Sequence, residues 1–139
     1  MNMLDEVRTW LISTSTGNTQ IGPGLGTTVP IYKLQKPAST GNMHVLYQYG
    51  GPAPDDVYAV TLDNPGLQVI TLSAATSDMG YQQALKIQNR LRHVANTWLP
   101  TTTGSYYIYI IPVQSPIGLG LDVNGRMQWS QNFSMKMSY

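Results

Sequence analysis

Large side chains alternate with small polar ones through the whole C-terminal stretch Met127–Tyr139. A β-strand sends successive side chains to opposite faces, so this period of two predicts one long strand with a buried face and a solvent-exposed face. A strand of that length belongs to a sheet, which constrains the fold more than any other feature of the chain. The predicted buried face consists of Met127, Trp129, Gln131, Phe133, Met135, Met137 and Tyr139.

Shorter stretches upstream have the β-branched and aromatic content of strands. They are Val29–Leu34, His44–Tyr49, Val57–Leu62, Leu67–Ser73 and Tyr106–Val113. Asp63-Asn64-Pro65-Gly66 is a strong turn signal, which predicts a hairpin between the third and fourth of these stretches. Asn124-Gly125, before the last strand, is typical of a tight type I′ hairpin turn.

Two amphipathic segments predict helices. Met3–Ser13 has apolar residues three and four apart, with Asp5 and Glu6 in a first turn where the helix dipole favours negative charge. Asp78–Leu99 has the stronger pattern; Ser77 or Asp78 can cap its start, and Pro100 stops it. Its apolar stripe consists of Ala84, Ile87, Leu91, Val94 and Trp98. We therefore expect an α+β fold, a mostly antiparallel sheet with a short N-terminal helix and one long helix packed on it.

The length of 139 residues suits one core, and no repeat or linker divides the chain, so a single domain over residues 1–139 is expected. Only 11% of the residues are charged, whereas typical soluble domains have roughly 25%. Amides, hydroxyls and tyrosines are easier to desolvate than charged groups, so such a surface suits extensive protein contact. A merely neutral, polar surface explains the same composition.

Several classes of function are disfavoured by composition. A net charge of +1 gives no reason to expect a nucleic-acid partner, and the absence of cysteine excludes disulfides, thiol catalysis and Cys-based zinc sites. No run approaches the ~20 apolar residues of a membrane span. No signal peptide is recognisable at the N-terminus, where charged residues interrupt the apolar ones. A soluble protein is expected.

Candidate catalytic groups are few. His44 and His93 do not have the spacing of metal ligands, and Asp55-Asp56 are neighbours in a Gly/Pro-rich stretch rather than carboxyls held in distinct environments. A Gly-x-Ser-x-Gly motif is missing, and Gly118–Asp122 lacks both the glycine pattern and the following helix of a phosphate-binding loop. We expect no enzyme, no cofactor and no metal site.

A basic group lies on the polar side of the predicted long helix. Lys86, Arg90, Arg92 and His93 can contact phosphates, but no aromatic residues interleave with them as in single-strand binders. Such helix faces more often only keep a protein soluble. Lys86 and Arg90 are nevertheless candidate interaction residues, and a small nucleic-acid-binding module is the alternative function of a different class.

Two segments rich in glycine, proline, serine and threonine are candidate contact loops. Gly17–Thr28 contains Gly22, Pro23 and Gly24, and Lys36–Met43 contains Pro37 and Ser39, so these five residues are candidate interaction residues. Each loop could become ordered on assembly. Surface loops without a role are the alternative.

Two segments carry a family resemblance over about residues 55–139. The predicted long helix opens with Tyr81 and Ala84, and the closing strand contains the pair Asn132-Phe133. Between them lies a turn with Ser115, Pro116, Gly120, Asp122, Gly125 and Arg126. In this pattern the chain resembles the tail terminator, or tail-completion (minor capsid), proteins of long-tailed bacteriophages. The segment 72–76 lacks the Arg that relatives often carry there, so a role tied to that residue is not transferred.

The resemblance implies a structural virion protein. Such a protein forms a ring, expected to be a hexamer, that caps the tail tube, stops its polymerisation and joins it to the head-completion (connector) protein. The implied partners are further copies of the chain, the major tail tube protein and the connector protein, with no membrane. Asp122 and Arg126 join the candidate interaction residues through the shared turn. Another neck component, such as a head-completion protein, is the alternative, and assembly in the host cytoplasm is expected.

Overall fold

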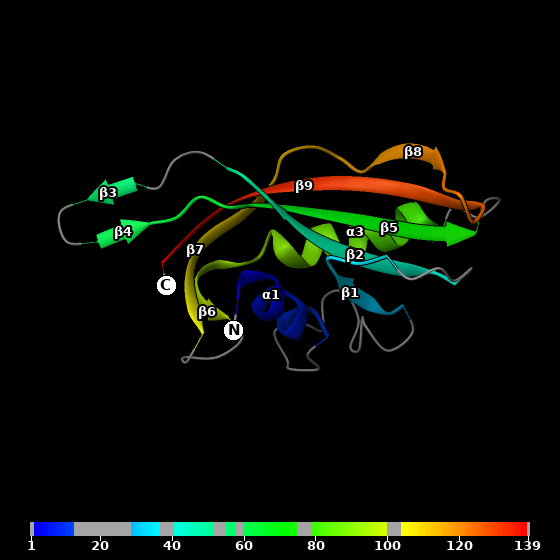
Figure 1. The fold of residues 1–139 in the computed structure, drawn as a ribbon. Coiled ribbons are helices and arrows are strands. Elements are labelled where there is room, and N and C mark those ends of the chain that lie inside the picture. The colour runs from blue at the N-terminus through cyan, green and yellow to red at the C-terminus, as the bar shows by residue number, and fades with distance from the viewer. Residues whose placement is uncertain are drawn as a thin grey trace.

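The computed structural model describes residues 2–12, 29–36, 41–51, 55–57, 60–74, 79–99 and 104–138. Within these ranges the chain forms a seven-stranded mixed sheet, a separate two-stranded arm and two helices (Figure 1). In chain order the elements are α1 (Met3–Ile12), β1 (Ile31–Lys33), β2 (Met43–Tyr49), β3 (Asp55–Val57), β4 (Val60–Leu62), β5 (Gly66–Ala74), α3 (Met79–Leu91), β6 (Ala95–Leu99), β7 (Ser105–Pro112), β8 (Ile117–Leu121) and β9 (Arg126–Ser138). The predicted α+β class is confirmed.

The closing strand β9 organises the sheet, whose order is β1-β2-β5-β9-β7-β6. It pairs with β5 along one edge, and with β8 and then β7 along the other. Every pairing in this sheet is antiparallel except that of β1 with β2. A mostly antiparallel sheet was expected, and a strand with neighbours on both sides explains the length of the sequence alternation.

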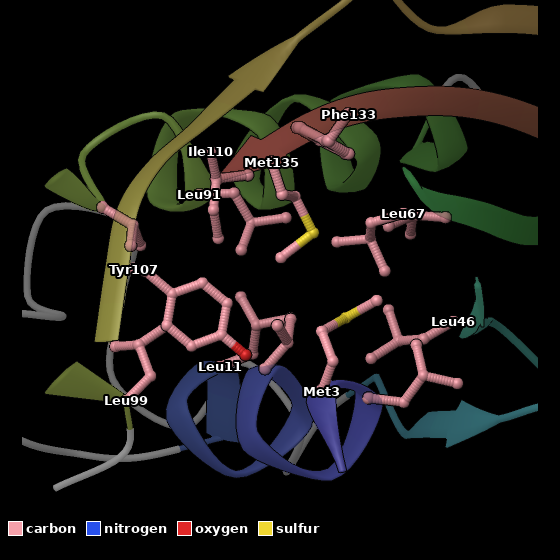
Figure 2. Packing of buried hydrophobic residues seen from close by; sticks show 14 of the residues in the cluster. Met3, Leu11, Leu46, Leu67, Leu91, Leu99, Tyr107, Ile110, Phe133 and Met135 are labelled. Carbon is pink, nitrogen blue, oxygen red and sulfur yellow. The ribbon is translucent and has the colours of Figure 1, made fainter. Parts of the chain in front are cut away.

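The main core lies where α1 and α3 cover the sheet. Met3, Val7 and Leu11 of α1 are buried, and Figure 2 shows Met3 and Leu11 pointing toward side chains that come from the sheet and from α3. Opposite them lie Leu46, Leu67, Ile87, Leu91, Tyr107, Ile110, Phe133 and Met135. The spacing of three and four in both helices is therefore explained by one shared apolar interior.

The alternation of the last strand is confirmed in its C-terminal half, where Phe133, Met135 and Met137 are buried and their neighbours are partly exposed. In the N-terminal half the prediction is wrong: Met127 and Trp129, expected on the buried face, are only partly buried, whereas Arg126 and Ser130 of the other face are buried. That part of β9 is therefore covered on both faces. Gln131 occupies an apolar-face position because its side-chain amide donates to the carbonyl of Ala84 in α3, at 2.9 Å.

The predicted long helix is wrong beyond Leu91. Arg92 and His93 form a turn, and Ala95–Leu99 is the edge strand β6, paired with β7. Val94, just before β6, and Leu99, at its end, are buried, whereas Trp98, which the predicted helical stripe would bury, is 44% exposed. Asn96, within β6, has a φ of 49°, a left-handed conformation that asparagine tolerates. The proposed start at Ser77 or Asp78 and the stop at Pro100 lie outside the described residues.

The predicted hairpin between Val57–Leu62 and Leu67–Ser73 is also wrong. β4 pairs with β3, and the two form an arm that projects beyond the sheet, whereas β5 pairs with β2 and β9 (Figure 1). Asp63 leaves the arm and forms a bridge with Met137, with N–H···O distances of 2.8 and 3.0 Å. Pro65 has no backbone N–H to donate. The segment Asp63–Gly66 therefore interrupts the hydrogen bonding between strands and does not reverse the direction of the chain.

The hairpin at Asn124-Gly125 is confirmed, but its turn type and its partner strand differ from the prediction. The turn joins β9 to β8, a strand in a stretch for which the sequence predicted only a turn. The N–H of Gly125 donates to the carbonyl of Asp122, and Gly125 alone in the turn has a positive φ, of 75°. A type I′ turn needs positive φ at both central residues, so this is a three-residue loop that ends on a left-handed glycine.

Candidate interaction surfaces

Asp122 is the centre of a charged cluster at the β8–β9 turn. Its Oδ1 accepts the N–H groups of Asn124 and Arg126, both at 2.9 Å. Its Oδ2 accepts Nε and Nη2 of Arg126 at 3.0 Å and lies 3.3 Å from Nζ of Lys36. Side chain and backbone thus fix the same turn, which is why an aspartate precedes the Asn-Gly pair by two residues.

The electrostatics of the cluster follow from this geometry. Burial by itself raises the pKa of Asp122, but the hydrogen bonds from Arg126, Asn124 and Lys36 more than offset it and lower the pKa to about 2. The side chains of Asp122 and Arg126 are each only 2% exposed. The structure therefore brings these two predicted interaction residues together, but as a support inside the fold rather than as a protruding contact.

Arg126 reaches from the turn across the sheet. Its Nη1 lies 3.4 Å from the sulfur of Met43 in β2, so the guanidinium covers part of a small second apolar cluster formed by Met43, Val45 and Leu72. A buried guanidinium remains charged when a carboxylate accepts its hydrogen bonds, as Asp122 does. The shared turn of the family pattern has a structural explanation in this chain.

Lys86 and Arg90 occupy the same helix but different environments. Lys86 is exposed, whereas Arg90 is buried against α1, where its Nη2 donates to the carbonyl of Trp10 at 2.6 Å and its guanidinium lies 4.7 Å from the centre of the Trp10 ring. Burial lowers the pKa of Arg90 to about 10, so the side chain is still charged at neutral pH. Arg90 is therefore not part of an exposed basic face. Its positive charge instead lies near the C-terminal end of α1, where it binds a backbone carbonyl and an aromatic ring.

The remaining predicted contact residues, Gly22, Pro23, Gly24, Pro37 and Ser39, lie outside the described residues. The loop Gly17–Thr28 lies wholly outside them, and of Lys36–Met43 only Lys36 and Gly41–Met43 are described. Those five assignments stay predictions.

Sequence reasoning missed an apolar margin, which we define as the exposed side chains Ile111, Val113, Ile117, Leu119, Leu121 and Val123. It follows the end of β7, the whole of β8 and the β8–β9 turn, and its members are between 49% and 95% exposed. The signal was present as apolar residues at every second position from 117 to 123. This stretch was instead assigned to the turn of the family pattern. Contiguous exposed apolar side chains mark contact sites in soluble proteins.

The margin differs chemically from a catalytic site. Among the described residues no group of three or more His, Asp or Glu side chains is placed to hold a metal ion. Neither described helix combines the length and the apolar content that crossing a membrane requires. A charge-poor α+β chain with an exposed apolar sheet margin is of the kind found among structural assembly proteins.

Comparison with known proteins makes that class specific. The family described as "Bacteriophage tail terminator protein" matches residues 15–139, so the chain belongs to the bacteriophage tail terminator family. It is thus a structural protein of the virion tail and associates with other virion components. The resemblance that the sequence motifs indicated is confirmed.

A solved structure shares the fold. A chain of the "Virion of native gene transfer agent (GTA) particle" superposes with a TM-score of 0.62 at 12% sequence identity, covering 88% of this chain and 90% of that one. At this identity the likeness concerns the fold alone. No curated protein matches the sequence.

Proposed function

We propose that the chain is a single-domain, non-enzymatic protein that forms a homo-oligomeric ring, expected to contain six copies, on the end of the phage tail tube. The ring stops tube polymerisation and provides the docking face for the head-completion (connector) protein. It acts through shape and occupancy, without a cofactor, and it assembles in the host cytoplasm. Family membership supports the place in the virion, and the apolar margin is the observation that supports assembly.

A ring closes through a heterologous interface, in which two different surfaces of one subunit meet. The apolar margin supplies one such surface. A second, separate apolar pair, Tyr32 and Leu34, is exposed on and just after β1. Burying both in contacts between copies removes apolar area from water at little electrostatic cost, because the margin contains no charged residue.

The test uses the tail tube protein of the same virus. Purified chain is added to polymerising tube protein; tube lengths and tube ends are measured by negative-stain electron microscopy, and free and tube-bound stoichiometry by native mass spectrometry. We expect shorter tubes with one end occupied by a ring of this chain. A chain that stays monomeric and leaves tube length unchanged would refute the proposal.

The alternative neck role, that of a head-completion protein, is distinguished by which neighbour binds. The same chain is mixed with tail tubes and, separately, with connector-bearing heads. Binding to head connectors before any tail is present, without capping of tubes, would favour the head-completion role. Binding to tube ends first favours the terminator role.

A further inference from the structure

Among the described residues, the register of the sheet places two unpaired edges at the same level. Tyr32 pairs with Val45, which pairs with Ile70, then Ser130, then Ile117, so one continuous row runs from β1 to β8. The neighbouring row runs from Ile31 to Gly118 through His44, Thr71 and Trp129. Figure 1 shows the same order, with β8 and β1 at opposite margins of the five strands.

The directions of the two edge strands are complementary. β1 runs parallel to β2, and each later step to β5, β9 and β8 reverses direction, so β8 runs opposite to β1. If a second copy continues the sheet, β8 of one copy and β1 of the next meet as an antiparallel pair. That arrangement allows direct hydrogen bonding between short strands.

Each edge has some backbone groups available, although α1 already uses one carbonyl of β1. Backbone groups of Pro30 and Leu34 form hydrogen bonds with β2. Because the backbone groups of a strand alternate in direction, those of Ile31 and Lys33 point away from the sheet. The carbonyl of Ile31 accepts a hydrogen bond from Nε of Arg8 at 2.7 Å. Lys33 is the central outward residue of this edge. On β8 the N–H of Asp122 donates to Arg126, so by the same alternation the backbone of Leu121 faces outward. In the described part of the chain, β8 pairs with β9 alone.

The side chains lack the usual protection of exposed strands. Natural proteins guard free edges with lysine, proline or inward-pointing charges. β8 has the sequence Ile-Gly-Leu-Gly-Leu, with neither charge nor proline, and its one protective feature is a β-bulge between Gly118 and Gly120. On β1, the charge of Lys33 is paired with Asp5 of α1 in the same copy, and Tyr32 and Leu34 are 37% and 61% exposed.

We propose that β8 of one copy binds beside β1 of the next copy, and that this antiparallel strand pairing, with the apolar margin against Tyr32 and Leu34, is the contact between subunits. This rests on the proposed function, because it specifies how the ring closes. The partner is a second copy of the chain, because the two edges lie at the same level and run in opposite directions. One edge of each copy can then pair with the other edge of the next, as a head-to-tail interface requires. The other edge strand, β6, offers no such match, because it runs parallel to β1.

A charge placed on the margin tests the contact. Leu119 is exposed, so Leu119→Lys should leave the monomer folded by circular dichroism. At the interface it buries an unpaired ammonium group, and the concentration for half-assembly should rise by roughly tenfold or more. Ala95→Lys, an exposed position on β6, is the matched control and should assemble like the unmodified chain.

Disulfide trapping tests the pairing itself, which is possible because the chain has no cysteine. Directly opposed residues of antiparallel strands lie about 4.5–5.5 Å apart between Cα atoms, within the range of a disulfide. The double variant Tyr32→Cys with Ile117→Cys should form linked multimers under mild oxidation on tube ends, as should Leu34→Cys with Ile117→Cys if the register is shifted by two. Ala95→Cys with Ile117→Cys should not.

The outcomes separate the two proposals. If the unmodified chain caps tubes as rings but neither the 32/117 nor the 34/117 variant links, or if Leu119→Lys still assembles normally, the strand pairing is wrong and the terminator function stands. If Leu119→Lys forms rings but no longer binds tubes, the margin contacts the tube protein instead, and the pairing is again wrong. If no ring forms on tubes at all, both proposals fail.

Discussion

The carboxylate of Glu6 connects the N-terminal helix to the far edge of the sheet. It is 1% exposed, and it accepts the N–H of Ser105 at 2.5 Å and the hydroxyl of Tyr107 at 3.0 Å. In the sequence Glu6 is explained by the helix dipole alone, together with its neighbour Asp5. The structure gives the two acids different roles, because only Glu6 faces the interior.

Replacing Glu6 by Ala should lower the free energy of unfolding by about 2–3 kcal/mol, since a buried N–H and a buried hydroxyl lose their acceptor. Urea unfolding monitored by tryptophan fluorescence measures the change. Asp5→Asn is the control, and it should change stability little because its pair with Lys33 is exposed. Equal losses from both variants would contradict the role given to Glu6.

His44 is the buried titratable group for which a pH dependence is expected. Its Nδ1 lies 2.8 Å from Oγ1 of Thr71, and the residue is fully buried in β2. Burial lowers its pKa from 6.5 to about 4, against the smaller opposing effect of a hydrogen bond with Gln83. The folded state thus keeps the imidazole neutral at pH values where the unfolded chain protonates it.

Because the folded pKa is below the unfolded one, the unfolded state binds more protons between pH 6.5 and 4, and stability should fall as pH is lowered through that window. The expected loss is on the order of 3 kcal/mol. It is measured as the difference between the unmodified chain and His44→Gln in unfolding experiments at several pH values. His93→Gln, at an exposed position, should keep the original slope; a flattened slope there would contradict the assignment to His44.

The contact between α3 and the sheet is set by a close approach at Gly80. A Cβ atom at this position would lie 2.4 Å from Oγ of Ser73 in β5 and 2.7 Å from Cδ1 of Trp129 in β9. Trp129 in turn packs edge-on against Tyr81, with ring centres 5.2 Å apart. The first turn of the helix can therefore lie directly on the two strands only because this side chain is absent.

Gly80→Ala should destabilise the protein by about 1–3 kcal/mol, as overpacked sites do. In an exposed helix interior the same change would stabilise by up to about 1 kcal/mol, so the sign of the effect is diagnostic. Thermal unfolding measures it. Gln82→Ala, on the exposed side of the same turn, provides the comparison and should be neutral or slightly stabilising. A stabilising Gly80→Ala would mean that the helix lies farther from the sheet.

At the scale of the elements, sequence periodicity predicted α1, β2, β5, β7 and β9 closely, because each has a face buried in the core. It failed where two structures fit the same pattern. Val94 and Trp98 are four residues apart, a spacing that suits a helix, yet Trp98 is an exposed residue of the strand β6, and pairing with β7 decided between the two structures. The arm was misread for a related reason: Asp63–Gly66 has turn chemistry, yet the bridge to Met137 determines the direction of the chain.

The whole molecule has few charges and one net positive charge, so the proposed contact between copies is apolar rather than electrostatic. The described charged groups are largely engaged within the chain, as in the Lys33–Asp5 and Asp122–Arg126 pairs. Screening by salt acts on exposed charges and leaves apolar burial intact or strengthened.

Assembly of the ring should therefore change by less than about threefold in midpoint concentration when sodium chloride is raised from ~50 to ~500 mM. Light scattering over a dilution series at each salt concentration measures this. A nucleic-acid-binding module would behave in the opposite way, losing affinity steeply with salt. Polynucleotide retention on the same salt series is thus the control, and salt-sensitive assembly would contradict the apolar interface.

The sequence by itself determined the fold class, the long closing strand, the N-terminal helix and the family, because these depend on local periodicity and on short motifs in the chain. Tertiary structure alone decided that Arg90 and Arg126 are internal, that α3 ends at Leu91, and that β8 is an edge strand with an apolar margin. The physical reason is that burial and strand pairing depend on partners far away in sequence. A residue's own type and spacing do not specify which of those partners it meets.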